Sequence, residues 1–162
     1  MNEIAKTAKI SSLCDIETSS RGSKLIASEG VTIDSFVKIK FVGGLGNIEI
    51  GENSFINSGC VLYSGNGIRI GKNVLIAANC TLAPVNHEFK DRSQTIISQR
   101  FKPSKGGIII EDDVWVGSGV IILDGAIIKK GSVIGAGCIV NMVTEEHGIY
   151  TGNPLTLKGY RK

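Results

Sequence analysis

The chain has 162 residues, of which 42% are hydrophobic and 20% are charged, so it can fold around one core and is not a disordered segment. Its net charge is only +3 and its aromatic residues are scattered, so we expect no nucleic-acid partner. The 21 glycines are about twice the usual share, but they have no three-residue period and only 3 prolines accompany them, which excludes collagen.

The N-terminus and the cysteines are typical of a cytoplasmic protein. No stretch reaches about 18 apolar residues and the first residues lack the apolar region of a secretory signal, so we expect no membrane span and a cytoplasmic location. Cys14, Cys60, Cys80 and Cys138 show no CxxC spacing, and only two histidines accompany them. We therefore expect no metal site and no disulfide framework, and we interpret the cysteines as small apolar core residues.

The first 45 residues contain a weak repeat of aliphatic side chains. The spacing is six residues at Ile4, Ile10 and Ile16, and again at Ile33 and Ile39. Ile26 lies seven residues before Ile33, so the period is broken there by one residue. We interpret residues 1–45 as degenerate copies of a repeat that becomes regular further along the chain.

From residue 46 onward the period of six is regular. The spacing is interrupted twice, because Ile70 lies eight residues after Leu62 and Ile110 lies twenty-eight after Leu82. Twelve positions in this pattern hold only Ile, Leu or Val, and they are Ile50, Ile56, Leu62, Ile70, Ile76, Leu82, Ile110, Val116, Ile122, Ile128, Ile134 and Val140. A second column, four residues later, holds small or β-branched residues except at Asn66 and Asn86, where the period breaks. Glycine often follows the aliphatic residue directly, as at Gly51, Gly71, Gly117 and Gly135.

This period predicts an all-β parallel β-helix of hexapeptide repeats. Each unit supplies one short strand and one turn, three units close a triangular coil, and the aliphatic column fills the prism. Gly and Asn suit the positive φ angles of such turns. Residues six apart do not share one face of an α-helix, and an antiparallel sandwich would show turns about every 8–12 residues. We expect about six to seven coils.

The departures from the repeat define the predicted organisation of one domain over residues 1–162. Degenerate coils occupy 1–45, regular coils occupy 46–83 and 108–144, a long inserted loop occupies 84–107, and a short tail occupies 145–162. Because a regular prism is a scaffold, we look for chemistry on the loop. It contains His87, one of two histidines, and a histidine is a suitable general base at neutral pH.

Three sequence segments resemble the hexapeptide-repeat acyltransferases, and most closely the maltose, galactoside and polysaccharide O-acetyltransferase branch. They are APVNHEF, IIIEDDVWVGSGVIILDGAIIKKGSVIGAGCIV and IYTGNPLTLK, and the resemblance covers about residues 45–160. It implies a left-handed coil, acetyl-CoA as co-substrate, a sugar or other saccharide as acceptor, and a homotrimer with active sites between subunits.

The resemblance also implies roles for individual residues. His87 is the expected general base, with Asn57 and Asn86 as further catalytic residues, whereas no residue is expected to bind a metal. The residues expected to contact coenzyme A (CoA) are Trp115, Ser118, Gly135, Ala136, Asn141, Lys158 and Arg161. Ser118 is also a candidate oxyanion donor, and Lys162 could join Lys158 and Arg161 at the phosphates.

Two departures from the family pattern concern the substrates. Asn141-Met142 replaces a common Thr-Lys pair, and no acidic residue near Gly65 matches the sugar-binding residue of the galactoside enzymes. The sequence therefore predicts an acetyl-CoA-dependent O-acetyltransferase of a sugar hydroxyl, for example in surface-polysaccharide biosynthesis, with an acceptor other than a galactoside. The alternatives are N-acetylation of an amino sugar, acetylation of an antibiotic, and a non-catalytic β-helix scaffold subunit.

Overall fold

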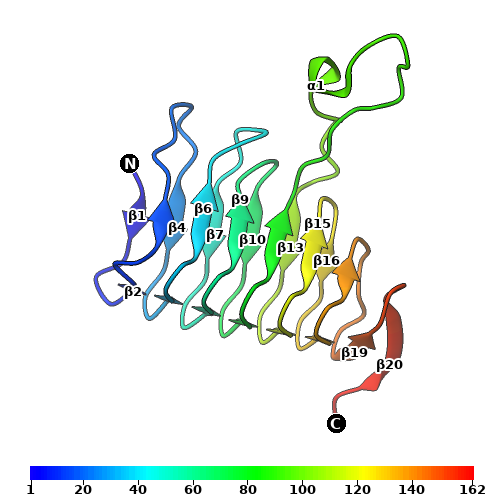
Figure 1. The fold of residues 1–162 in the computed structure, drawn as a ribbon. Helices are drawn as coiled ribbons and strands as arrows, with labels where there is room; N and C mark the ends of the chain where they lie inside the picture. The colour runs from blue at the N-terminus through cyan, green and yellow to red at the C-terminus, as the bar shows by residue number, and fades with distance from the viewer.

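The computed structural model describes residues 1–162 and shows a three-sided prism of stacked coils, with a long loop at one edge and a strand pair at the C-terminal end (Figure 1). The coils are joined by parallel strand pairing into three sheets, which we call A, B and C. Each coil contributes one short strand to each sheet, so β1 to β18 make six coils. The structure therefore confirms the predicted all-β parallel architecture.

The strands follow one another around the prism in the order A, B, C. Sheet A contains β1 (Glu3–Ile4), β4 (Leu25–Ala27), β7 (Ile48–Ile50), β10 (Ile68–Ile70), β13 (Ile108–Ile110) and β16 (Ile127–Ile128). Sheet B contains β2 (Lys9–Ile10), β5 (Thr32–Ile33), β8 (Phe55–Ile56), β11 (Leu75–Ile76), β14 (Trp115–Val116), β17 (Val133–Ile134), β19 (Gly148–Thr151) and β20 (Thr156–Tyr160). Sheet C contains β3 (Asp15–Ile16), β6 (Lys38–Lys40), β9 (Val61–Tyr63), β12 (Thr81–Ala83), β15 (Ile121–Leu123) and β18 (Ile139–Val140).

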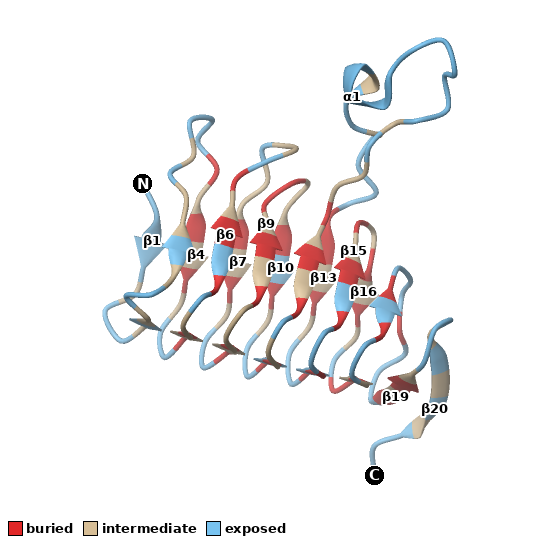
Figure 2. Ribbon diagram, in the orientation of Figure 1, coloured by how far each residue is buried: buried red, intermediate tan, exposed pale blue.

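The interior of the prism is filled by the aliphatic column. All twelve of its regular members are buried, and each stacks on the equivalent residue of the next coil, as Ile50, Ile70 and Ile110 do in sheet A. Burial of one such side chain contributes about 1.5–3 kcal/mol, so the stacked column is the main source of stability. Figure 2 shows the buried residues along the strands and the exposed residues on the turns and the loop.

The N-terminal coils are more regular in the structure than in the sequence. Strands β1 to β6 pair in the same register as the later coils. The prediction that Ile26 belongs to the aliphatic column is wrong, because Ala27 is buried there and Ile26 lies half-buried on the outer side of β4. Ala27 lies six residues before Ile33, so the period is intact and only the size of the side chain differs.

Two glycine columns have different physical causes. Gly119 has a φ of +68° and its missing Cβ would face open space, so this glycine is favoured by the turn conformation. Gly117 follows the aliphatic residue directly, and a Cβ there would lie 2.6 Å from the backbone nitrogen of Ala136. Glycines of the Gly117 type are therefore required by the close stacking of coils, and those of the Gly119 type by the turns.

The edges of the prism differ in how the chain turns. At the corner between sheets C and A, which we call the C–A corner, segments 17–24, 41–47, 64–67 and 84–107 project outward. The corner between sheets B and C, the B–C corner, has only short turns. The 84–107 loop extends far from the prism and carries α1 (Ile96–Gln99), the one helix of the chain. The tail adds β19 and, antiparallel to it, β20 to the end of sheet B.

Candidate functional site

The base of the 84–107 loop is a short two-stranded stem. His87 lies directly opposite Phe101 in an antiparallel bridge, with flanking hydrogen bonds from Glu88 N to Arg100 O (3.0 Å) and from Lys102 N to Asn86 O. The rings of His87 and Phe101 lie on one face of the stem, with centroids 4.7 Å apart. Because side chains alternate along a strand, Asn86 and Lys102 lie on the opposite face.

The hydrogen bond of His87 fixes its tautomer. Its Nδ1 lies 3.2 Å from the carbonyl oxygen of Arg100, and a carbonyl can only accept a hydrogen bond, so Nδ1 carries the proton in the neutral ring. Nε2 then has a free lone pair, and the side chain is exposed to solvent. The predicted base is thus held in the form that can accept a proton at its outer nitrogen.

A buried carboxylate fastens the returning arm of the loop to the prism. Asp124 is only 4% exposed, and its Oδ1 accepts the N–H of Gly107 at 2.9 Å. Its Oδ2 accepts the N–H of Lys105 at 2.9 Å and the amide of Asn66 at 3.2 Å. Asp124 is absent from the residues predicted from the sequence. A signal was present, because Asp124 is an acidic residue two positions after an aliphatic residue, in a coil next to the insertion.

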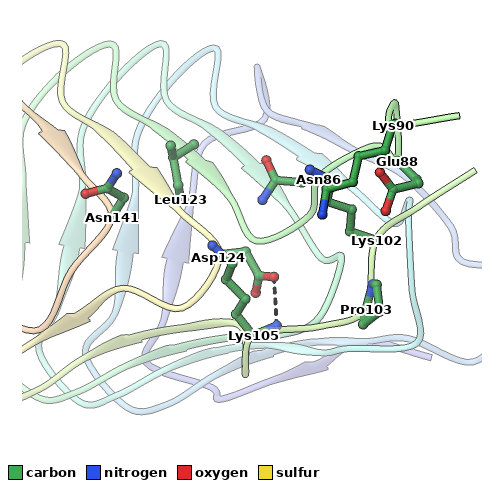
Figure 3. A pocket seen from close by; sticks show the side chains of 9 residues that line it. All are labelled: Asn86, Glu88, Lys90, Lys102, Pro103, Lys105, Leu123, Asp124 and Asn141. Carbon is green, nitrogen blue, oxygen red and sulfur yellow. Dashed lines mark hydrogen bonds between the residues drawn. The ribbon is translucent and has the colours of Figure 1, made fainter. Parts of the chain in front are cut away.

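A cavity of about 570 Å³ lies between the loop and the C-terminal coils (Figure 3). Of the predicted site residues, Asn86 from the stem and Asn141, which follows β18, both line it. The backbone N–H of Lys105 donates to Asp124 within this cavity, as the dashed line in Figure 3 shows. Glu88 also lines it, and the backbone N–H groups of Phe89 and Lys90 hold the pKa of its carboxyl below the ordinary value.

Four predicted site residues lie instead on the B–C corner. Asn57 belongs to the third coil, Ser118 to the fifth, and Gly135 and Ala136 to the sixth. With strands about 4.8 Å apart, they cover about 14 Å along the prism. A Cβ at Gly135 would lie 3.0 Å from Thr151 Cγ2, so any larger residue would crowd the contact where β19 stacks on β17.

The remaining predicted residues lie on sheet B and the tail. Trp115 is 51% exposed on the outer side of β14. It shares a shallow pocket of about 310 Å³ with Arg161, whose guanidinium donates to Asp113 Oδ2 at 2.9 Å and to the carbonyl of Gly131 at 3.0 Å. Lys158 lies on the exposed strand β20. The charge of Arg161 is thus already paired within the chain.

One chain therefore does not bring the predicted site residues together. His87, Asn86 and Asn141 lie at the C–A corner, whereas Asn57, Ser118, Gly135 and Ala136 lie along the B–C corner. No group of three or more His, Cys, Asp or Glu side chains is arranged to hold a metal ion, and no helix has the length and apolar character needed to span a bilayer. Cys60, Cys80 and Cys138 are buried, and Cys14 is half-buried.

The repeats match two family descriptions. Residues 107–141 match the family described as bacterial transferase hexapeptide (six repeats), and residues 47–84 match the hexapeptide repeat of succinyl-transferase. The two matches flank the 84–107 loop. The predicted interpretation of the period of six as hexapeptide repeats is thereby confirmed.

The chain is also similar to individual acetyltransferases. It is 36% identical over 112 residues to the galactoside O-acetyltransferase of Escherichia coli, a match that covers 67% of this chain and 51% of that protein. The chain spans about half the length of the curated relatives it matches. The crystal structure of a maltose O-acetyltransferase from Clostridium difficile is similar with a TM-score of 0.71 and 28% identity, covering 82% of this chain and 67% of that one.

A further structure supports the fold over nearly the whole chain. AntD, an N-acyltransferase from Bacillus cereus in complex with dTDP and 3-hydroxybutyryl-CoA, superimposes with a TM-score of 0.80 and 22% identity, over 99% of this chain and 83% of that one. At this identity the match bears on the fold alone. The fold is the left-handed parallel β-helix that the resemblance implied. We conclude that this chain is a hexapeptide-repeat protein related to the galactoside and maltose O-acetyltransferases.

Proposed function

We propose that this chain is an acetyl-CoA-dependent O-acetyltransferase that acts on a sugar hydroxyl, for example in the biosynthesis of a surface polysaccharide. The observation that carries the proposal is the hydrogen bond from His87 Nδ1 to the carbonyl of Arg100, which leaves Nε2 as the basic nitrogen. The relatives that are 30% or more identical include two galactoside O-acetyltransferases, which favours transfer to oxygen over transfer to nitrogen.

In the proposed reaction His87 Nε2 removes the proton of the acceptor hydroxyl as its oxygen attacks the thioester carbonyl. The carbon–sulfur bond then breaks, and the imidazolium returns the proton to the departing thiolate of CoA, so no proton is gained or lost. The backbone carbonyl of Arg100 accepts a hydrogen bond from Nδ1–H throughout and so stabilises the positively charged ring. Ser118 and neighbouring backbone N–H groups are the proposed donors to the oxyanion.

The separation of the predicted residues supports assembly of the site from two copies of the chain. We place the C–A corner of one subunit, with His87, against the B–C corner of the next, with Asn57 and Ser118, and a cyclic homotrimer repeats this contact three times. The outer faces of sheets B and C supply apolar side chains for such contacts. Leu75 and Ile121, which are 45% and 38% exposed, are examples.

The base assignment is tested with His87→Asn. We expect kcat to fall by about 10²-fold or more, because asparagine cannot act as the base. Folding should be unchanged, because asparagine is also polar and suits an exposed loop position. His147→Asn is the matched control, since His147 is the other histidine and has a φ of +57° that asparagine tolerates. Near-normal turnover of His87→Asn with a sugar acceptor would disprove the assignment.

The shared site is tested by mixing two inactive variants, His87→Asn and Asn57→Ala. In a mixed trimer, some contacts join the intact His87 of one subunit to the intact Asn57 of another. We therefore expect partial activity after the subunits are exchanged, and a trimer mass by light scattering. A fully active monomer, or no recovery on mixing two inactive variants that form trimers, would contradict the arrangement.

A further inference from the structure

The excess positive charge of the chain lies on one segment. The loop of residues 84–107 contains five Lys or Arg and two acidic residues, whereas the rest of the chain is balanced at 13 basic and 13 acidic residues. The loop therefore accounts for the whole net charge of +3. A charge excess confined to one loop at the mouth of a cavity is a feature that a scaffold does not require.

None of the acidic residues of this region forms an ion pair with its lysines, although the charges of Lys102 and Lys90 help to lower the pKa of Glu88. Glu88 Oε1 accepts the backbone N–H of Phe89 at 2.8 Å and that of Lys90 at 3.2 Å. Asp91 accepts hydrogen bonds from Ser93 and Gln94. Both oxygens of Asp124 accept backbone N–H groups of the returning arm, as described above. All ion pairs of the chain lie elsewhere.

Three of these lysines line the 570 Å³ cavity together. Lys90 and Lys102 lie with Asn86 at its loop end, and Lys105 approaches from the returning arm (Figure 3). Lys102 Nζ lies 3.7 Å from the centroid of the Phe89 ring, which limits where its charge can lie. The amides of Asn86 and Asn141 make no hydrogen bond within the group of lining residues, so they remain available to a ligand.

We propose that this cavity binds the diphosphate ester group of a nucleotide-like substrate. Three ammonium groups and two amides supply more donors than one carboxylate can use, whereas a diphosphate offers several anionic oxygens over a comparable distance. The size suits a ligand larger than a free ion. The cavity lies on the face of the stem opposite His87, so it holds a part of the ligand away from the reacting atoms.

Two substrates of the proposed reaction could carry this group, and the inference rests on that proposed function. CoA contains a diphosphate, and so does a nucleotide-linked sugar as acceptor. The tail cation expected at the phosphates, Arg161, is already bound to Asp113 and Gly131, whereas the loop lysines have no such partners. The cavity thus assigns phosphate recognition to the loop.

The experiment is calorimetric titration of the full chain with CoA, pantetheine and dTDP, without turnover. The variant is Lys90→Gln with Lys102→Gln, and the control is Lys38→Gln on an exposed site of β6. We expect the double variant to bind CoA or dTDP at least about tenfold more weakly, and the control to bind as the unchanged chain does. The affinity of the unchanged chain should also fall more steeply with salt concentration than that of the double variant. If the double variant loses affinity for CoA alone, the diphosphate bound in the cavity belongs to the acyl donor. If it loses affinity for dTDP alone, the diphosphate belongs to a nucleotide-linked acceptor.

Several results would overturn the inference. These are unchanged affinity of the double variant for both CoA and dTDP, an equal loss for pantetheine, which lacks the diphosphate, or no binding of either nucleotide by the unchanged chain. Circular dichroism must show the same fold in each variant. Because binding is measured without turnover, His87→Asn should bind normally even if the base assignment fails, so failure of the cavity and failure of the proposed reaction are distinguishable.

Discussion

Asp124 provides the sharpest test of how the loop is held. Replacing it with alanine leaves the N–H groups of Gly107 and Lys105 without their acceptors, while the amide of Asn66 also loses a partner. Each buried donor left unsatisfied costs about 1–3 kcal/mol. Gly107 is buried and Lys105 is exposed, so water replaces the carboxylate at only one of the two backbone sites. We therefore expect Asp124→Ala to lower the free energy of unfolding by about 2–4 kcal/mol.

The matched control is Asp112→Ala. Asp112 occupies the same position of the six-residue repeat, two residues after the aliphatic residue, and its Oδ1 also accepts a backbone N–H, that of Lys72 at 2.8 Å. It is exposed, so water can take its place and we expect a cost of about 1 kcal/mol or less. Asp124 also accepts three hydrogen bonds where Asp112 accepts one, so hydrogen-bond number and burial both predict the larger cost for Asp124→Ala.

The assay is urea unfolding at one fixed protein concentration, because association of subunits would add to the apparent stability. Hydrogen exchange at the amide of Gly107 reports directly on its hydrogen bond to Asp124, and we expect this exchange to become much faster in Asp124→Ala. The reasoning is wrong if Asp124→Ala and Asp112→Ala have the same stability and the amide of Gly107 stays equally protected.

Two further predictions concern the coils. Gly117→Ala should destabilise the chain by about 1–3 kcal/mol, because its Cβ would meet backbone of the next coil, and Gly119→Ala by about 1–2 kcal/mol of turn strain; an unchanged thermal midpoint for Gly117→Ala would contradict the stacking argument. The hydrogen bond from Lys129 holds the pKa of Glu111 below its ordinary value, so the carboxylate stabilises the fold above its unfolded pKa and this contribution disappears as the pH falls through the folded pKa. The stability difference between the unchanged chain and Glu111→Gln should thus be full at about pH 7 and shrink toward about pH 3, as urea titrations at both pH values would show.

The fold could be predicted from the sequence because its determinants repeat. Each coil places a residue such as Ile50 or Ile76 in the same environment, so the aliphatic type recurs at a fixed spacing and can be counted. The exception, Ala27, shows the limit of counting aliphatic residues, because a small side chain can occupy a column position while a larger neighbour, Ile26, lies outside.

The candidate site could be predicted only in part, because its geometry depends on contacts that have no period. His87 was identifiable as a histidine on the one long insertion, but the carbonyl that orients it belongs to Arg100, 13 residues later. The side of the stem on which each residue lies, and so the separation of His87 from Asn86, depends on the bridge to Phe101. Local sequence carries no signal for that pairing.

The position of Asp124 shows what additional information the repeat contained. A period of six treats all repeat units alike, but the prism has three different sides. The same local environment therefore recurs only once per coil, that is, every third repeat unit. Two residues after the aliphatic residue, the units of sheet C in the middle coils bury Ser64, Pro84 and Asp124, whereas sheets A and B leave the equivalent positions exposed or half-buried. The loops at the C–A corner cover these positions and leave a charged residue there in need of hydrogen-bond partners. Sorting the repeat units by side therefore separates Asp124 from Asp112 by sequence position alone, because only the carboxylate on the side of the insertion can fasten the loop.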